Sequence, residues 1–484
     1  MLLAIDQGTT SSRAIRFDRK GHVQQIAQHE FPQIYPQNGW VEHDPEAIWQ
    51  TSLAMAQQAC DDAVTAIGIT NQRETIVLWD RATGKPLHNA IVWQDRRTAD
   101  YCAALKADGN EPMVQAKTGL LLDPYFSGTK LKYLLDTVPG ARDRASRGEL
   151  AAGTIDTFLL WRLTGGRVHA SDVTNAGRTL LFNIHTMAWD DDLLRLFDIP
   201  ASVLPEVHAN AHIFGETDPA LFGRAIPIAG MAGDQQSALI GQACFEPGMV
   251  KSTYGTGCFM LINTGDKAMA STNRLLTTPA YRIGADTAYA LEGSIFVAGA
   301  AIKWLRDKMG LVNASEESEA MAKAANPDHG VIMVPGFTGL GAPYWAPNAR
   351  GLICGMTLDT TAADLVRATL ESIAYQTRDL TQAMARDGAP APAAIRIDGG
   401  MSQNGWFAQF LADMLAAPVE RPDSHETTAL GAAFLAGITT GVFADTKDCA
   451  QGWHAAARFD PAMADDRRVA LYSAWQKAVE RTLL

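Results

Sequence analysis

The first thirty residues carry apolar runs separated by polar turns, a pattern that predicts a meander of short strands. Residues 2–5 form an apolar run typical of a buried strand, residues 12–17 are strand-like again, and the polar stretch at 6–10 separates them. A second turn at 18–21 leads to a third strand over residues 22–30. We therefore expect the chain to open with a hairpin whose first turn has the sequence Asp-Gln-Gly-Thr-Thr.

Strands and helices alternate through the rest of the chain. Residues 64–70 and 75–80 are predicted strands, and the apolar run at 226–233 leads into a helical stretch that begins at Asp234. This alternation indicates an α/β protein.

A long amphipathic helix is predicted over residues 361–386. Thr361 and Asp364 form a capping pattern at its start, and Gly388 follows its end. The stripe on its predicted buried face consists of Val366, Leu370, Ile373, Thr377, Leu380 and Met384. Further on, a strand at 395–398 is predicted to lead through two glycines into another amphipathic helix.

The second half of the chain repeats the beginning of the first. Residues 248–265 are predicted to form a strand, a Gly-Thr-Gly turn and a second strand, as residues 2–17 do around their own turn. Two halves that start in this way indicate a duplicated architecture with a cleft between them. We expect a first domain of residues 1–245 and a second of residues 246–484.

Length and charge narrow the class of protein. A chain of 484 residues exceeds the size at which one core stops growing, so two domains or more are expected. Its 41 basic and 53 acidic residues give a net charge of −12, which disfavours a general surface for nucleic acid or anionic membrane. Phosphate chemistry must then rely on local arginines, metal ions and backbone amides.

The cysteines and the N-terminus favour a cytoplasmic protein. The six cysteines form no CxxC pair, and the N-terminus has neither a basic segment nor a long apolar run. These features predict a reduced protein without structural zinc, secretory signal or membrane-spanning segment.

Three glycine-containing loops, at 6–10, 254–257 and 398–400, are candidates for binding a nucleotide. None has the Walker A or GxGxxG pattern, and each alone is a weak signal. Together they lie at the starts of the two halves and ahead of a helix, where free backbone amides favour phosphate. Asp6 lies where a carboxylate could hold the waters of a magnesium ion. Arg13 could reach a transferred phosphoryl group, or it could be a surface arginine.

A second group of residues has the chemistry of a polyol-binding site, which needs donors, acceptors and apolar walls. Arg73 and Glu74 follow a predicted strand and can serve one ligand only if the chain turns there; the alternative is an exposed ion pair. Asp234 lies between a strand and a helix, where N-capping is the alternative. The other candidates are Trp93, Tyr125, Gln235 and Phe259.

Runs of sequence spread over residues 4 to 437 resemble one family closely. They include AIDQGTTSSRA, GITNQRET, GKPLHNAIVWQDRRTA, AGDQQSALIGQ, YGTGCFM, LEGSIFVAGAAIKWLRD, FTGLGAPYW and DGGMSQN. The chain resembles the FGGY carbohydrate kinases of the actin-like ATPase superfamily, and several runs are typical of the members that phosphorylate glycerol. The resemblance implies two actin-like (ribonuclease H-like) α/β domains with the active site in a central cleft.

The resemblance also implies an activity and a role for individual residues. The activity is ATP-dependent phosphorylation of glycerol to sn-glycerol 3-phosphate, the first step of glycerol catabolism, with Asp234, Arg13 and Asp6 as catalytic residues and Asp234 accepting the hydroxyl proton. The implied glycerol pocket consists of Arg73, Glu74, Trp93, Tyr125, Asp234, Gln235 and Phe259. ATP is implied to bind Thr9, Thr10, Ser11, Arg13, Gly255, Thr256, Gly299, Lys303, Gly400 and Asn404, and Mg²⁺ to bind Asp6 through water. A homodimer or homotetramer is expected by the same analogy.

Several positions depart from the family pattern. Lys303 stands where bacterial relatives commonly have glutamine, which leaves nucleotide preference open, and Tyr133 replaces a tryptophan. The stretch at 218–227 lacks the GGTR run through which fructose 1,6-bisphosphate inhibits some relatives. No phosphorylation role is assigned to His208 or His212.

Two alternatives to glycerol phosphorylation stay open. A kinase for another short polyol or ketose, such as erythritol or xylulose, would use the same loops, and pocket length is not visible in sequence. An ATP-driven conformational protein would need the nucleotide loops alone, and the combination of Arg73, Glu74, Trp93 and Asp234 argues against it.

Overall fold

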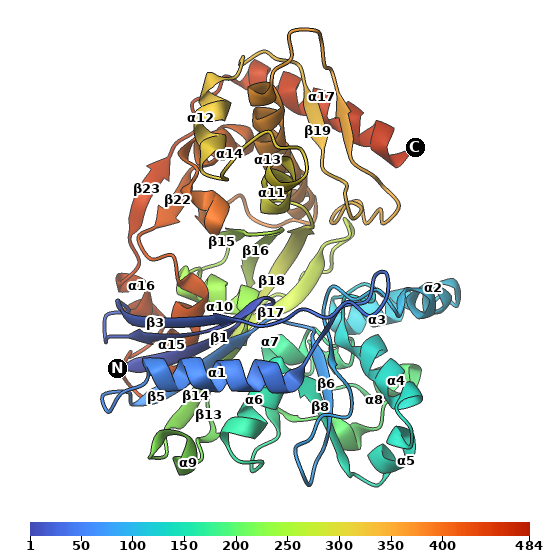
Figure 1. Ribbon diagram of the computed structural model, residues 1–484, viewed down its shortest axis with the longest axis vertical. Coiled ribbons are helices and arrows are strands. Elements are labelled where there is room, and N and C mark those ends of the chain that lie inside the picture. Colours follow the sequence, from blue (N-terminus) through green and yellow to red (C-terminus); the bar gives the residue numbers. More distant parts are fainter.

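A computed structural model describes residues 1–484 as two lobes that share one long sheet (Figure 1). Its thirteen strands pair in the order β23 (Ala455–Phe459), β22 (Val419–Pro422), β21 (Ile395–Asp398), β15 (Val250–Tyr254), β16 (Cys258–Gly265), β18 (Asp286–Ile295), β17 (Leu276–Ile283), β13 (Ala211–Glu216), β14 (Pro227–Gly233), β5 (Ala66–Asn71), β1 (Leu2–Gln7), β2 (Ser11–Phe17) and β3 (Val23–Glu30). The predicted α/β class is confirmed.

Smaller sheets lie beside this one. A four-stranded sheet contains β4 (Glu42–His43), β7 (Ala90–Ile91), β6 (Ile76–Asp80) and β8 (Leu150–Thr154). Three strand pairs complete the set: β10 (Phe182–Asn183) with β11 (Ala188–Trp189), β12 (Glu206–His208) with β9 (Ala170–Asp172), and β19 (Ile332–Val334) with β20 (Leu352–Cys354).

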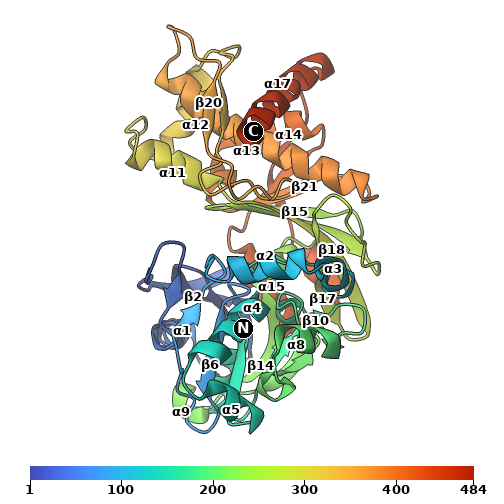
Figure 2. The same cartoon turned by 90° about the vertical axis from the view of Figure 1, so that its right-hand side faces the viewer.

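Helices cover both lobes, as the perpendicular view of Figure 2 shows. Those of the first half are α1 (Pro45–Ala59), α2 (Ala99–Ala107), α3 (Glu111–Thr118), α4 (Ser127–Thr137), α5 (Ala141–Ser146), α6 (Ile155–Leu163), α7 (Val173–Ala176), α8 (Asp191–Phe197), η1 (Ala201–Val203), α9 (Pro219–Phe222) and α10 (Asp234–Gly241). Those of the second half are α11 (Gly299–Asp307), α12 (Glu317–Ala324), α13 (Ala362–Arg386), η2 (Gly400–Gln403), α14 (Gly405–Leu415), α15 (Thr427–Thr439), α16 (Thr446–Gln451) and α17 (Asp465–Leu483). None of them combines the length and the hydropathy that crossing a bilayer requires.

The two predicted hairpins are present, and the first strand of each also pairs with a parallel strand on its other side. β1 pairs antiparallel with β2, where Asp6 lies opposite Arg13, and parallel with β5. β15 pairs antiparallel with β16 and parallel with β21, where Thr253 lies opposite Asp398. The repeat in sequence is therefore a repeat in structure. In each half, a hairpin turn and the end of a parallel strand share one edge of the sheet, where α/β proteins commonly bind ligands.

Helix α13 begins and ends as the sequence predicts. Thr361 and Asp364 make the reciprocal hydrogen bonds of a capping box, and Gly388, with a φ of 89°, follows the C-cap Asp387. The strand-to-helix unit that follows differs from the prediction, because the short 3-10 helix η2 lies between β21 and α14. The two glycines after β21 therefore lead into a tight turn, and Asn404 caps α14.

Helix α15 joins the two halves of the chain. It comes late in the sequence but packs against β1, β5, β14 and α10 of the first half. A Cβ placed on Gly431 of α15 would lie 1.9 Å from the carbonyl oxygen of Ser237, and one on Gly241 of α10 would lie 1.9 Å from that of Thr427. Glycine at both positions lets the two helix backbones approach this closely. The predicted boundary between residues 245 and 246 stays a prediction.

Candidate active site

The chain turns sharply where β5 ends, as a shared role for Arg73 and Glu74 requires. Glu74 has a φ of 61°, in the left-handed region, and the N–H of Thr75 donates to the carbonyl of Arg73 at 2.7 Å. Both side chains are buried by the turn, so the alternative of an exposed ion pair is wrong. A non-glycine residue in this region costs about 1–3 kcal/mol, and such strain is concentrated at functional sites.

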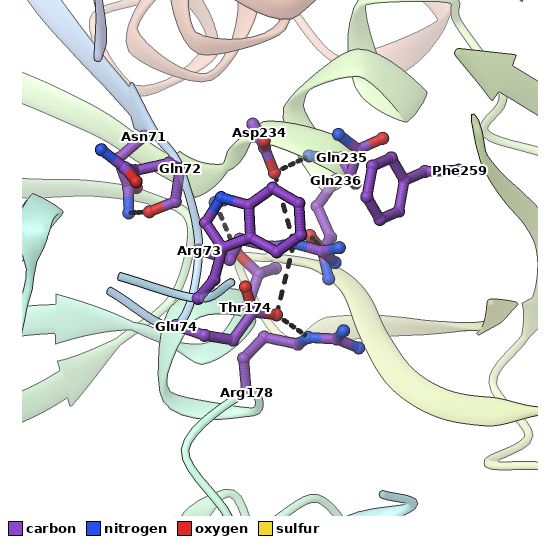
Figure 3. A network of polar contacts seen from close by, with 12 residues as sticks. Asn71, Gln72, Arg73, Glu74, Thr174, Arg178, Asp234, Gln235, Gln236 and Phe259 are labelled. Atoms are coloured by element: carbon purple, nitrogen blue, oxygen red, sulfur yellow. Dashed lines mark hydrogen bonds and ion pairs between the residues drawn. The ribbon is translucent and has the colours of Figure 1, made fainter. Parts of the chain in front are cut away.

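Four buried charges form a network around this turn, part of which Figure 3 shows. Arg73 donates to both carboxylate oxygens of Glu292, at 2.6 and 3.0 Å. Arg178 donates to Glu74 at 2.6 Å and to Glu292 at 2.9 Å. Burial alone would raise the pKa of Glu292, but Arg178 and Arg73 outweigh it and lower the pKa to about 2. The network is balanced, with two positive and two negative groups, and it joins the first half of the chain to β18.

Arg73 is fully engaged within the protein. Besides Glu292, its N–H groups lie within reach of Gln236 at 3.1 Å, Tyr125 at 3.5 Å and Asp234 at 3.2 Å. The four N–H groups of Nη1 and Nη2 therefore have protein acceptors, and Nε forms an ion pair with Asp234. Arg73 fixes the positions of its neighbours, and its own contact with a substrate stays a prediction.

Asp234 is the first residue of α10, directly after β14. The N-cap of this helix is Gly233, so the alternative of capping by Asp234 is wrong. A side chain at position 233 would collide with Arg73, because a Cβ there would lie 2.7 Å from both Cγ and Cδ of the arginine. The carboxylate oxygen Oδ1 of Asp234 faces Arg73 and accepts a 2.7 Å hydrogen bond from the N–H of Gln235 (Figure 3).

The other oxygen of Asp234 is available for chemistry. Oδ2 makes no hydrogen bond within the protein, and the side chain is 31% exposed. Even so, the surrounding protein desolvates the carboxylate and raises its pKa to about 6, against the opposing effect of Arg73. A carboxylate with a free oxygen and a pKa near neutrality is suited to accept a proton.

Three aromatic rings form one wall of the site. Trp93 packs edge to face against Tyr125 and Phe259, with ring centroids 5.7 and 6.2 Å apart. Figure 3 shows the ring of Phe259 on the side of the site where Gln235 lies. The structure thus brings together all seven residues predicted for the polyol pocket. The faces of the three aromatic rings are suited to contact the C–H groups of a polyol.

One hydrogen bond connects this pocket to the first glycine loop. Trp93 Nε1 donates to the hydroxyl oxygen of Thr9 at 3.0 Å. Thr9 lies in the β1–β2 turn, which is closed by a 2.9 Å hydrogen bond from the N–H of Gly8 to the carbonyl of Ser11. Thr10, in the same turn, is exposed. The aromatic wall and the loop predicted for phosphate therefore adjoin.

Asp6 and Arg13 form an ion pair beside this loop. Their closest nitrogen and oxygen atoms are 2.5 Å apart, and Arg13 also donates to Glu426 at 2.9 Å, just before α15. Arg13 is half-buried, so it is not a freely solvated surface arginine. The strand that carries it delivers the guanidinium to the edge of the first loop.

The second and third loops meet at the start of α11. The carbonyl oxygen of Thr256 accepts hydrogen bonds from the N–H groups of Ala298 and Ala300, and that of Gly255 accepts one from Gly299. A Cβ placed on Gly399 would lie 2.5 Å from the carbonyl oxygen of Tyr254, so the third loop packs against the second.

The remaining residues predicted to bind ATP lie near this junction or on the helices beside it. A Cβ placed on Gly400 would have no atom within 4 Å. Asn404 caps α14 and donates to Ser318 at 3.1 Å. Lys303 is exposed on α11 and makes no hydrogen bond within the protein. The structure shows no contact that tests the role of Lys303 toward a nucleotide, which stays a prediction.

Four buried residues of the site are missing from the sequence prediction: Glu292, Arg178, Lys251 and Gln236. Their partners are remote in sequence, since 219 residues separate Arg73 from Glu292. A signal did exist for two of them, because Lys251 is the single charge of β15 and Glu292 is the only charge of β18 beyond its first residue, Asp286. Charges at such positions are rarely buried without a partner.

Comparison with known proteins places the chain in a family. Residues 1–241 match the N-terminal domain of the FGGY family of carbohydrate kinases, and residues 250–440 match the C-terminal domain. The glycerol kinase of Rhodospirillum centenum is 61% identical over 487 residues, which cover 99% of this chain and 98% of the relative. That of Ectopseudomonas mendocina is 60% identical over 486 residues with the same coverage. The chain belongs to the FGGY family of carbohydrate kinases.

Solved structures of FGGY kinases have the same fold. The crystal structure of Plasmodium falciparum glycerol kinase with ADP is 38% identical, with a TM-score of 0.94, and the match covers 100% of this chain and 98% of that one. A ligand-bound xylulose kinase from Lactobacillus acidophilus, 22% identical, has a TM-score of 0.88 and covers 99% and 98%. The predicted membership of the FGGY family and the two-lobed actin-like fold are confirmed.

Proposed function

We propose that this FGGY kinase transfers the γ-phosphoryl group of ATP to a terminal hydroxyl of glycerol, giving sn-glycerol 3-phosphate and ADP. Its full-length relatives at about 60% identity are glycerol kinases, which supports the choice of substrate. The observation that carries the proposal is the hydrogen bond from Trp93 to Thr9, because it makes the polyol pocket and the first glycine loop neighbours.

The pocket suits a small triol. Glu74 and Asp234 each keep one carboxylate oxygen without a protein partner, so both can accept hydrogen bonds from substrate hydroxyls. Trp93, Tyr125 and Phe259 offer faces to the C–H groups. The fixed ion pairs hold the acceptors in place before the substrate arrives, which lowers the entropic cost of aligning the reacting hydroxyl.

In the reaction, the terminal hydroxyl oxygen of glycerol attacks the γ-phosphorus in line, and the bond from phosphorus to the bridging oxygen of ADP breaks. Asp234 accepts the hydroxyl proton through its free oxygen. Because the transition state of phosphoryl transfer is loose, this proton leaves late, and Asp234 first orients the nucleophile. Closure of the two lobes would exclude water and limit hydrolysis of ATP.

Backbone amides, hydroxyls and one arginine would bind the phosphates. Thr9, Thr10 and Ser11 of the first loop and Thr256 of the second would offer N–H and O–H donors. Gly255, whose N–H donates to the carbonyl of Gly257 at 2.9 Å, would shape the second loop around the phosphates. Arg13 would add positive charge beside the transferred group. The rest of the nucleotide would lie along Gly299, Lys303, Gly400 and Asn404.

Asp6 would hold Mg²⁺ through water. No group of three or more histidine, cysteine, aspartate or glutamate side chains gathers into a metal site in the structure. A single carboxylate fits magnesium, which retains several waters and shares its remaining positions with substrate phosphates. Magnesium bound with ATP supplies positive charge that offsets the β- and γ-phosphates.

Replacing Trp93 by phenylalanine should uncouple the pocket from the loop. The ring remains, but the hydrogen bond to Thr9 is lost, and a neutral hydrogen bond contributes about 0.5–1.5 kcal/mol. We expect kcat/KM for ATP to fall by roughly two- to tenfold in steady-state assays at saturating glycerol. An unchanged kcat/KM for ATP would contradict the proposed coupling between the polyol pocket and the first loop.

A coupled assay of ADP release with a panel of polyols tests the proposed function. ADP should appear with glycerol and ATP, and release without any polyol should stay below about one per cent of that rate. Faster turnover with erythritol or xylulose would show that the protein is a kinase for another polyol or ketose and not for glycerol. Release that does not depend on a polyol would favour an ATP-driven conformational protein.

A further inference from the structure

Lys251 is a fully buried cation of β15 that reaches across to the first half of the chain. Its Nζ donates to the side-chain oxygen of Gln235, to the hydroxyl of Thr253 at 3.0 Å and to the carbonyl of Phe259 at 3.3 Å. Three acceptors match the three N–H groups of an ammonium, so the lysine has no donor left for a substrate. Any role of Lys251 in the site must therefore come from positioning the groups that it contacts.

The contact with Lys251 fixes the orientation of the Gln235 amide. An ammonium group only donates, so the amide has to turn its oxygen, Oε1, toward Nζ. The amide nitrogen, Nε2, then lies on the far side and has no acceptor within the protein. Gln235 directly follows Asp234 in the first turn of α10, and Figure 3 shows the two residues side by side near Phe259. Nε2 of Gln235 is thus an unpaired N–H donor next to the carboxylate of Asp234.

This donor complements the two carboxylates of the pocket. Glu74 and Asp234 are carboxylates and only accept when ionised. The four Nη donors of Arg73 already bind protein acceptors, and its Nε is paired with Asp234. A hydroxyl group both donates and accepts, so a site made of carboxylates alone would satisfy only its hydrogen.

We propose that Lys251 is a specificity-determining positioning residue: by binding Oε1 of Gln235 it presents Nε2 as a donor to a hydroxyl oxygen of the substrate. This inference rests on the proposed function. It identifies the preferred substrate class further, as polyols that place a hydroxyl oxygen against Gln235. An analogue without that hydroxyl leaves the amide nitrogen unpaired and should react less well.

A double-mutant cycle between Lys251 and Gln235 tests the proposal. Lys251→Met keeps the length of the side chain but lets the amide rotate, and Gln235→Ala removes the donor. We expect each single variant to lower kcat/KM for glycerol about tenfold or more, mainly through KM for glycerol and with little change in KM for ATP. The double variant should be within about twofold of Gln235→Ala, because Lys251 acts through Gln235. Losses that multiply to about a hundredfold would overturn the proposal.

Lys130→Met is the matched control for this cycle. Lys130 is also a fully buried lysine, but its Nζ donates to the carbonyl of Tyr125 at 2.9 Å and does not contact Gln235. Its loss should multiply with that of Gln235→Ala. Equal coupling of both lysines to Gln235 would mean that a general structural change, and not the orientation of the amide, causes the effect.

Gln235→Glu tests the role of the N–H donor separately from any effect on the stability of the fold. Glutamate keeps an oxygen for Lys251 but replaces the N–H donor by a second oxygen. The unfolding temperature should therefore not fall, while KM for glycerol should rise about tenfold or more. The preference for glycerol over at least one of 1,2- and 1,3-propanediol should shrink as well. An unchanged KM and an unchanged preference would overturn the proposal, even if Lys251→Met fails to fold.

The proposed function can fail separately. If the wild-type protein phosphorylates another member of the polyol panel faster than glycerol, the assignment to glycerol is wrong. The same cycle is then measured with that polyol, and coupling between Lys251 and Gln235 is still expected. Absence of coupling with the preferred substrate contradicts the role of Lys251 alone.

Discussion

Replacing Asp234 by asparagine should lower kcat about a hundredfold to ten-thousandfold, the usual contribution of a general base. The amide retains the shape of the side chain and can still accept the hydrogen bond from the N–H of Gln235, so folding should be preserved. It cannot accept the proton of the reacting hydroxyl. Steady-state kinetics with glycerol and ATP measure the loss, and a decrease smaller than about tenfold, or roughly 1.4 kcal/mol of barrier, would show that Asp234 is not the base.

The pH profile provides an independent test of the same assignment. Only the ionised carboxylate accepts a proton, and the pKa of Asp234 is about 6. The wild-type kcat/KM should therefore fall roughly tenfold for each pH unit below about pH 6. The asparagine variant should lack this acid limb, and a limb that persists in the variant belongs to another group.

Glu74→Gln is the matched control for Asp234→Asn. Glu74 is a second carboxylate of the pocket, but its proposed role is to bind a hydroxyl and not to remove its proton. We expect its replacement to act mainly on KM for glycerol and to leave the acid limb in place. If Glu74→Gln abolishes the limb, the roles of the two carboxylates have to be exchanged.

Replacing Glu292 by glutamine should destabilise the protein by about 3–5 kcal/mol, the usual cost of removing one partner from a buried ion pair. Arg73 and Arg178 would remain buried with one carboxylate between them, where the wild type has two. Chemical unfolding of both proteins at neutral pH measures the difference in free energy of unfolding.

The effect should depend on pH with a defined sign. The pKa of Glu292 is lowered from 4.5 to about 2, so its stabilising contribution is complete above about pH 4.5 and disappears as the pH falls toward 2. The stability difference between wild type and Glu292→Gln should shrink over this range. Glu149→Gln removes one partner of an exposed ion pair with Arg147, so it is the control and should change the free energy of unfolding far less than Glu292→Gln.

Much of the fold could be predicted because its signals are local. The hairpins at both domain starts depend on apolar runs separated by short polar turns, and α13 is delimited by Thr361, Asp364 and Gly388. Each of these signals lies within a few residues of the structure that it determines. The tight turn η2 is not predictable in this way, because a strand followed by two glycines and a helix does not show which conformation the glycines adopt.

The chemistry of the site could be predicted only in part. Arg73, Glu74 and Asp234 were identified as candidates, but sequence could not decide whether they were buried together, because that depends on the left-handed conformation of Glu74 and the absence of a side chain at Gly233. Glutamate rarely adopts this conformation, so no propensity indicates it.

Contacts between residues on strands that are far apart in the sequence cannot be predicted for a different reason. Glu292 contacts Arg73 only because β18 and the end of β5 approach each other in the folded chain, and no periodicity in either segment records that approach. A charge with uncharged neighbours in the middle of a buried strand does indicate that a partner exists. It does not identify the partner.

The late position of α15 in the sequence affects how the protein can be made. A ribosome delivers β1, β5 and β14 long before it delivers Thr427–Thr439, so the sheet of the first half emerges with one apolar face still uncovered. Leu430, Phe434 and Leu435 share one hydrophobic cluster with Leu2 and Phe17. The first half therefore cannot complete its core during synthesis, as a self-contained domain would, and must wait for nearly the whole chain to be translated.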